Sequence, residues 1–423
     1  MSLSPSRRWC AALAACLMTL LLNGCGGGLL AGVGSGGSGI AEGTISGFGS
    51  VIVDGIEYDD SVLGSSADGL RLGQRVRLIY DEANAAQSLV LLPQLRGPID
   101  SAPDENGWMR VTGQWVRVVH TNDDITRSGA TTLGGYGAIA EVQAGQDTVV
   151  YGSWVFDTSK QAYVVVATRL ERLDGAADPV LTGGVVLSLS AHGLRLNQAD
   201  GTEVQAADLP VLENGQVVLV SVARSALAAA PLRATQVANG SLGGLDLAGY
   251  DSVRLGGLAS SYDAAARVVV IQGTRIPLAA SASVDATGLA QGQFVRIESA
   301  GARQDGGLVG DAAAMRPPVG AVAPGADDAG DTNVLKGTLS GVDWSAATVQ
   351  FTLRGTPVTA NAAVIGAVCR STPASGTLYV EVRGRVPAPG ATLSATQVDC
   401  STQLPVTAAV AQVDPQPPPA PAL

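Results

Sequence analysis

A short stretch near the start of the chain carries the pattern that decides the predicted fold, and it reads Ser50-Val51-Ile52-Val53-Asp54-Gly55-Ile56-Glu57-Tyr58. Apolar and β-branched residues on both sides of the Asp54-Gly55 pair indicate two short strands. Both central residues of a type I′ turn need a positive φ, which Asp and Gly adopt readily. The stretch is therefore typical of a tight β-hairpin. Comparable pairs between alternating runs are Asp200-Gly201, Gln272-Gly273 and Arg354-Gly355.

The surroundings of this hairpin recur along the chain. The run Gly43-Thr44-Ile45-Ser46-Gly47 returns as Gly337-Thr338-Leu339-Ser340-Gly341. A Gly-Gln pair also precedes an alternating strand at four places, 72, 70 and 77 residues apart, which are Gly73-Gln74, Gly145-Gln146, Gly215-Gln216 and Gly292-Gln293. Repetition at such intervals indicates copies of one small structural unit.

Each copy is expected to hold about five strands. In the strand Arg75–Tyr80, Val76, Leu78 and Tyr80 share one face while Arg75 and Arg77 share the other. Five tightly connected strands in one small unit favour a closed barrel, because closure removes the exposed edges through which sheets aggregate.

The run from Gly49 to Tyr58, followed by Leu72-Gly73-Gln74-Arg75-Val76, resembles the bacterial domain of unknown function 5666. The resemblance implies small barrels of oligonucleotide/oligosaccharide-binding (OB) type, repeated in secreted or lipid-anchored proteins. We therefore predict an all-β fold, a tandem array of about five small OB-like β-barrel modules after a lipoprotein signal peptide and a flexible tether.

The predicted boundaries follow from the repeats and from the Gly/Ser-rich and Pro-rich segments. They give a lipoprotein signal peptide at 1–24, a Gly/Ser-rich tether at 25–41, unit 1 at 42–95, unit 2 at 96–174, unit 3 at 180–240, unit 4 at 243–316, a linker at 317–333, unit 5 at 334–402 and a Pro-rich tail at 403–423.

The amino terminus has the features of an export signal. Arg7 and Arg8 precede an apolar run at 11–22 that is too short to span a bilayer. The run ends in Leu22-Asn23-Gly24-Cys25, which resembles a bacterial lipoprotein signal and implies that Cys25 becomes the acylated, palmitate-type anchor. The alternative is an ordinary secretory signal that happens to contain Cys25. Under the resemblance, Gly26 favours the outer membrane, with the protein facing the periplasm or the cell surface.

Cysteine usage agrees with an exported protein. Cys10 and Cys16 leave with the signal, so Cys369 and Cys400 remain beside Cys25. Two thiols in one domain of an exported protein are expected to form a disulfide bond. No nearby His or second Cys pair completes a metal site, so we predict neither a metal nor a cofactor.

Charge and the scarcity of histidine limit the possible functions. The chain has 26 basic and 37 acidic residues, a net charge of −11, and no basic stripe, which excludes nucleic acid as an expected partner. Its two histidines are His120 and His192, and no nucleophile elbow, zinc-binding helix or phosphate loop is present. We predict no catalytic residue. The alternative, an envelope hydrolase, is supported only by the segment from His120 to Asp124.

Aromatic residues concentrate in unit 2, where exposed rings could bind sugars or proteins. Trp108 and Tyr136 lie near predicted loops and are the candidates for exposure, and Arg110 is a candidate contact for an acidic partner. Trp115 shares a face with Met109 and Val111 if residues 109–119 form one strand, which predicts a core position.

Three functions remain open. The first is a non-enzymatic, lipid-anchored envelope protein whose repeated modules form an interaction or spacer array, because repetition provides reach and surface. The second is a carbohydrate-binding lipoprotein that uses the aromatics of unit 2. The third is the envelope hydrolase. Expected partners are the membrane, through the lipid anchor, and an envelope protein or polysaccharide.

Overall fold

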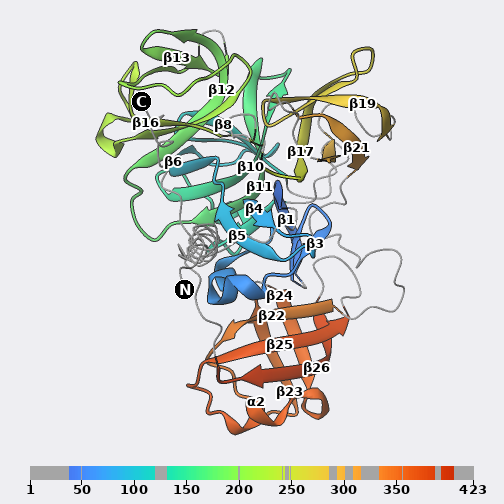
Figure 1. The fold of residues 1–423 in the computed structure, drawn as a ribbon. Helices are drawn as coiled ribbons and strands as arrows, with labels where there is room; N and C mark the ends of the chain where they lie inside the picture. The colour runs from blue at the N-terminus through green and yellow to red at the C-terminus, as the bar shows by residue number, and fades with distance from the viewer. Residues whose placement is uncertain are drawn as a thin grey trace, which may run out of the picture. The chain divides into compact units, whose positions relative to one another are not determined.

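The computed structural model describes residues 38–403 apart from 49, 120–130, 199–200, 241, 243–246, 248, 285–292, 301–307, 316–332, 355 and 386–391. All of these residues belong to one compact unit that spans residues 37–423. The fold is almost entirely β and consists of small five-stranded barrels, as the sequence predicts (Figure 1). The signal peptide, Cys25, residues 25–37 of the tether and nearly all of the linker and tail lie outside the described residues.

Unit 1 shows the plan that the other units repeat. It consists of β1 (Gly39–Phe48), β2 (Val51–Val53), β3 (Ile56–Tyr58), the 3₁₀ segment η1 (Ser61–Gly69), β4 (Arg75–Tyr80) and β5 (Ala86–Leu91). The long β1 bends at a bulge and pairs with both β2 and β4. A parallel bridge between Asp59 and Ala85 joins the hairpin to the last strand and closes the barrel. β1 begins at Gly39, three residues before the predicted start of unit 1.

Units 2 and 3 follow the same plan. Unit 2 consists of β6 (Leu95–Ser101), β7 (Trp108–Val111), β8 (Gln114–Val118), the 3₁₀ turn η2 (Ile139–Glu141), β10 (Asp147–Asp157) and β11 (Ala162–Arg172), with one additional short strand, β9 (Thr132–Gly134), that pairs with β11. Unit 3 consists of β12 (Val180–Ser190), β13 (Gly193–Leu196), β14 (Glu203–Gln205), β15 (Val217–Val222), the 3₁₀ turn η3 (Arg224–Ala226) and β16 (Leu232–Asn239). Parallel pairs β8–β11 and β14–β16 close the two barrels.

Units 4 and 5 complete the series. Unit 4 consists of β17 (Ser252–Asp263), β18 (Val268–Ile271), β19 (Thr274–Val284), β20 (Phe294–Ser299) and β21 (Gly310–Met315). Unit 5 consists of β22 (Asn333–Leu339), β23 (Thr348–Leu353), β24 (Thr356–Asn361), the 3₁₀ turn η5 (Ala362–Val364), the short helix α2 (Ala367–Ser371), β25 (Leu378–Arg385) and β26 (Leu393–Ser401). A disulfide bond joins Cys369 of α2 to Cys400 of β26, which confirms the predicted pairing.

The recurring Gly-Gln pair has a structural explanation. In the three copies whose two residues are both described, the glycine has a positive φ: +83° at Gly73, +87° at Gly145 and +92° at Gly215. The following glutamine accepts a hydrogen bond from the backbone N–H three residues earlier, at 2.8, 2.9 and 3.0 Å. Glycine permits the turn and glutamine satisfies a backbone donor that the turn leaves unpaired. The sequence repeat therefore marks one corner that precedes the fourth strand of the barrel.

The barrels share sheets rather than standing apart. The β1 strand of unit 1 pairs in parallel with β17 of unit 4, with Ala41 opposite Arg254. The β6 strand of unit 2 and the β12 strand of unit 3 meet at Arg96 and Leu181. In both cases the first strand of one unit pairs with the first strand of another. This holds for units 2 and 3, which are neighbours in sequence, and for units 1 and 4, which are far apart.

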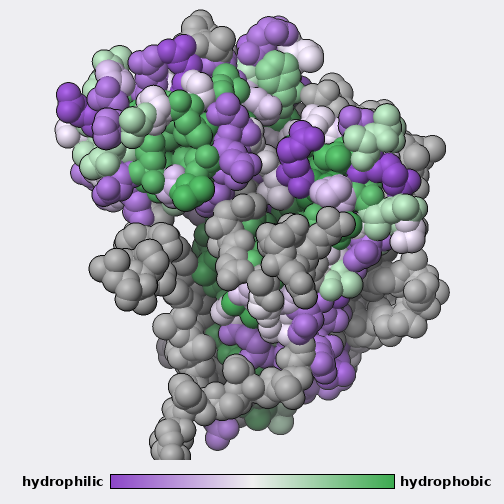
Figure 2. Space-filling view, turned by 45° about the horizontal axis from the view of Figure 1, so that its top comes forward, coloured by the Kyte–Doolittle hydropathy of each residue, from purple (hydrophilic) through white to green (hydrophobic). Residues whose placement is uncertain are grey.

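Apolar residues fill each barrel and continue between some of them. One cluster of buried side chains runs from unit 1 into unit 5, and another contains residues of units 2 and 4. In the view of Figure 2, green apolar side chains gather within a ring of purple polar ones at the upper left. Unit 3 also carries two of the large apolar side chains that stay exposed, Leu189 and Val211.

Candidate functional site

Two tryptophans and two arginines of unit 2 lie on one hairpin, β7–β8, that the sequence did not reveal. Residues 109–119 do not form one strand, because β7 turns back into β8 at Thr112 and Gly113, whose φ values are +51° and +82°. The turn reverses the side-chain parity, so Trp115 lies opposite Arg110 and Trp108 opposite Arg117. The prediction that Trp115 belongs to the barrel core is wrong: it faces outward, while Met109 and Val116 fill the core.

The two indoles of this hairpin hold three cations. Lys160, in the β10–β11 turn, places Nζ 4.2 Å from the ring centre of Trp115 and 4.8 Å from that of Trp108. The guanidinium carbon of Arg110 is 4.8 Å from the Trp115 ring, and that of Arg117 is 5.2 Å from the Trp108 ring. We call these five residues the basic face of unit 2. The π-cloud of an indole attracts a cation within about 6 Å, so each ring positions its cations.

The basic face is half-buried and rests on a fixed base. All five side chains are of intermediate exposure. Trp108 and Trp115 meet edge to face, with ring centres 6.3 Å apart. Both pack on a buried apolar cluster that includes Val164 of unit 2 and Phe294 of unit 4. The indoles are therefore held by the junction of two barrels while part of their surface remains open to solvent.

Tyr136 does not belong to this face. Its side chain is 6% exposed and packs in the core of unit 2, so the prediction of an exposed ring at this position is wrong. Burial raises the pKa of the Tyr136 phenol above its usual value. The residue follows Gly135, whose positive φ of +71° turns the chain back toward the barrel. A loop position in the sequence did not imply an exposed position in the fold.

The other sequence candidates do not assemble into a reactive site among the described residues. His120 and the Asp123-Asp124 pair lie outside them. No group of three or more His, Cys, Asp or Glu side chains that could hold a metal occurs in the described parts of the chain.

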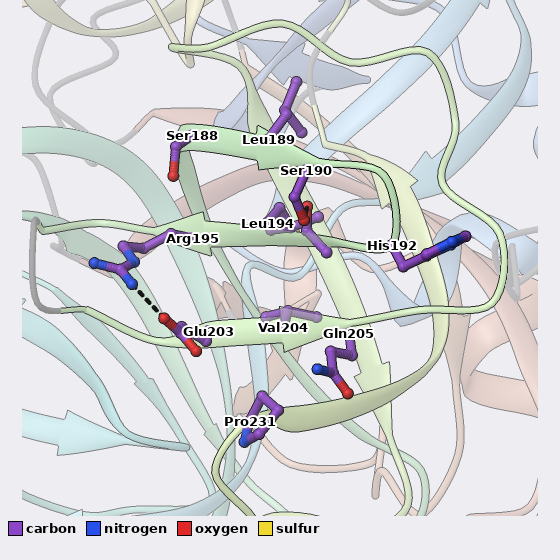
Figure 3. A pocket seen from close by; sticks show the side chains of 11 residues that line it. Ser188, Leu189, Ser190, His192, Leu194, Arg195, Glu203, Val204, Gln205 and Pro231 are labelled. Atoms are coloured by element: carbon purple, nitrogen blue, oxygen red, sulfur yellow. Dashed lines mark hydrogen bonds and ion pairs between the residues drawn. The ribbon is translucent and has the colours of Figure 1, made fainter.

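His192 lies at the end of a shallow hollow on unit 3. The hollow has a volume of about 280 Å³ and is lined by residues of β12, β13 and β14 and by Pro231 (Figure 3). Arg195 and Glu203 form an ion pair at the end of the hollow opposite His192, with 39% and 57% of their side chains exposed. In Figure 3 the imidazole of His192 extends away from this pair. The hollow thus places no acid or base beside the histidine, and its one ion pair is open to solvent.

Buried charges lie at the junction of units 1 and 4. Arg75 and Glu42 form an ion pair at 2.8 Å with both side chains 0% exposed, and Arg77 bonds the second Glu42 oxygen at 2.7 Å. Arg75 also donates to the carbonyl of Gly256 in unit 4. Burial alone would raise the pKa of Glu42, but the attraction of Arg77 and Arg75 outweighs it and holds that pKa below its usual value. Glu42 is therefore ionised at neutral pH and holds Arg75, and Arg75 makes the side-chain bond that reaches unit 4.

The first residue of three hairpin turns is a second kind of junction residue. Gln272 of unit 4 accepts a hydrogen bond from the Trp154 backbone of unit 2 at 2.7 Å. Arg354 of unit 5 is ion-paired with Asp60 of unit 1, and both side chains are buried. Asn197 of unit 3 donates to Gln114 of unit 2.

A positive φ at these turn positions favours polar residues, and packing of the units then buries them. The hairpin rule found the turns at Gln272 and Arg354 from sequence but placed the unit 3 turn at Asp200-Gly201 rather than at Asn197, and it could not show that these polar side chains reach into a neighbouring barrel.

Among the described residues, no helix is long and apolar enough to cross a bilayer. The comparisons with known proteins add no relative: no family model matches the chain, and no curated protein matches it.

Proposed function

We propose that the protein is a non-enzymatic, lipid-anchored component of the outer membrane whose barrels act as a scaffold that presents binding surfaces. The observation that carries this proposal is the use of buried polar residues. Arg75, which Glu42 holds, bonds a carbonyl of unit 4, and Gln272 and Arg354 bond residues of other barrels. A chain that commits its buried charges to such junctions is suited to holding surfaces in a fixed relation.

The anchor belongs to the same proposal and has a direct test. An acylated Cys25 would hold the scaffold at the membrane, since each buried CH₂ of an acyl chain contributes roughly 0.8 kcal/mol and two or more chains anchor stably. Cells grown with an alkyne fatty acid should label the wild-type chain and not the Cys25→Ala variant. Label retained by Cys25→Ala would contradict the lipid anchor.

The scaffold function is tested by measuring, in one assay, whether the protein binds cell-wall material and whether it cleaves that material. The acylated protein is reconstituted in vesicles of phosphatidylethanolamine and phosphatidylglycerol and mixed with purified cell-wall sacculi. If the protein is a scaffold, the vesicles should co-sediment with the sacculi on centrifugation. The sacculi should release no soluble fragments and gain no new reducing ends. Release of fragments would contradict a non-enzymatic role, and the absence of co-sedimentation would contradict binding to the cell wall.

A second candidate is carbohydrate binding, and the position of the basic face supports it. β7 and β8 are the second and third strands of their barrel, and in OB-type barrels these strands form the face that binds oligosaccharides or oligonucleotides. Fluorescence titration with envelope polysaccharides should show a change that Trp108→Ala reduces. No response to any of these polymers would refute this candidate.

A further inference from the structure

We propose that the basic face of unit 2 binds an acidic saccharide and that Lys160 and Arg110 hold its carboxylate or phosphate group beside Trp115. The proposal rests on the carbohydrate-binding candidate and specifies the class of sugar. It also differs from the expectation of an aromatic platform, because here cations cover the ring faces.

The distribution of charge supports an anionic ligand. The chain has a net charge of −11 and contains only two lysines, Lys160 and Lys336. Lys336 lies near a carboxylate, with its Nζ 3.8 Å from Glu381. By contrast, neither Lys160 nor Arg110 forms an ion pair with any carboxylate that the structure describes, although both stand over the same indole. Two cations gathered without a described counter-ion provide a site for an anion.

The local backbone holds Lys160 in this position. Asp157 accepts hydrogen bonds from the backbone N–H groups of Ser159 and Lys160 and from the Ser159 hydroxyl, at 2.6–2.9 Å. The next residue, Gln161, has a φ of +50° and returns the chain into β11. The nearest carboxylate along the chain is thus bonded to its own turn, and the ammonium group is directed onto the indoles.

The chemistry of the face matches a sugar acid better than a neutral sugar. A guanidinium group binds a carboxylate or phosphate through two parallel hydrogen bonds, and an ammonium group adds a point charge. The indoles are of intermediate exposure, so the part of their surface that the cations leave uncovered is available to the apolar C–H groups of a sugar ring. One molecule with an anionic substituent and a C–H face would use both parts of the site.

Because the chain has only two lysines, chemical labelling tests the site with an internal control. The mature protein is treated with a limiting amine-reactive acylating reagent, with and without an oligogalacturonate of about six sugars, and peptide mass analysis compares the two lysines. The oligogalacturonate should reduce labelling of Lys160 at least threefold and leave labelling of Lys336 unchanged. Equal labelling of Lys160 with and without the acidic oligomer would overturn the proposal.

Matched variants and probes separate the alternatives. Lys160→Met should weaken oligogalacturonate binding about tenfold, whereas Lys336→Met removes the same charge and should bind as wild type. If neutral cellohexaose binds as well as oligogalacturonate and does not protect Lys160, the proposal of an acidic saccharide is overturned. Carbohydrate binding itself would still be supported by that result. Equal binding of poly-glutamate would show a general anion site and overturn the saccharide. The vesicle assay judges the scaffold independently, and Lys160 protection in the wild type does not depend on the folding of any variant.

Discussion

The side chains of β4 show how much of a residue's environment a single strand can predict. Alternation correctly placed Val76, Leu78 and Tyr80 on one face and Arg75 on the other. Alternation normally implies that the second face meets water, yet Arg75 is 0% exposed because unit 4 covers it. A pattern local to one unit cannot reveal a partner that lies about 180 residues away in the sequence.

Glu42 is the residue whose removal should be most costly. Glu42→Gln leaves the buried Arg75 without its charge partner, which costs about 3–5 kcal/mol in comparable pairs. The pKa of Glu42 is lowered in the folded state, so its stabilisation is fully present above the ordinary carboxyl pKa and is lost as pH falls through the lowered value.

Urea unfolding of both proteins between pH 3 and pH 7 measures this difference. The gap in free energy of unfolding between wild type and Glu42→Gln should be constant above about pH 4.5 and shrink below it. A gap that stays the same at pH 3 would show that the ionised carboxylate is not its source.

At the scale of elements, the strands and most turns follow from sequence, and the exception is informative. Asp54-Gly55 is recognisable because both residue types favour positive φ. Thr112-Gly113 adopts the same turn with a β-branched residue that rarely has a positive φ, so the hairpin was predicted as one strand. The error moved Trp115 from the surface into the core and concealed the basic face.

Alanine substitutions at two turn glycines allow the cost of backbone strain to be distinguished from the cost of disturbed packing between barrels. Gly113 and Gly273 have φ values of +82° and +69°, but a side chain at Gly113 would meet open space. At Gly273 it would lie 2.4 Å from the carbonyl oxygen of Gly215 in unit 3. Gly113→Ala should cost about 1–2 kcal/mol through strain alone.

Gly273→Ala should destabilise the protein by a larger amount, because the turn must also withdraw from unit 3. Thermal or urea unfolding of the two variants measures the difference. Equal losses at both positions would argue against tight packing of this turn on the Gly215 corner.

The disulfide bond in unit 5 predicts a local effect of reduction. Cys369 and Cys400 are 31 residues apart, and a closed loop of that length stabilises by about 3–4 kcal/mol in the chain-entropy model. Dithiothreitol should therefore lower the urea midpoint of the transition that includes unit 5. The double variant Cys369→Ala with Cys400→Ala serves as the control, and its midpoint should not respond to the reductant.

At the level of the whole molecule, the sequence repeat predicts the barrels but not the contacts that join one barrel to another. Regular spacing of the Gly-Gln corner revealed a repeated unit because that corner is a local turn. The pairing of β1 with β17 left no comparable signal, since any first strand of a barrel has the same apolar pattern. The residues of the basic face are visible in the sequence, but their assembly from the β7–β8 hairpin and the β10–β11 turn is not.

The strand pairing that joins units 1 and 4 can be tested directly by disulfide crosslinking. In a Cys25→Ser background, Ala41→Cys with Arg254→Cys places thiols at opposed positions on one side of the shared sheet, within the reach of a disulfide bond. Ala41→Cys with Leu255→Cys is the control, because successive side chains point to opposite faces. We expect rapid crosslinking of the first pair under mild oxidation and free thiols in the second. Free thiols in both pairs would contradict a scaffold of joined barrels.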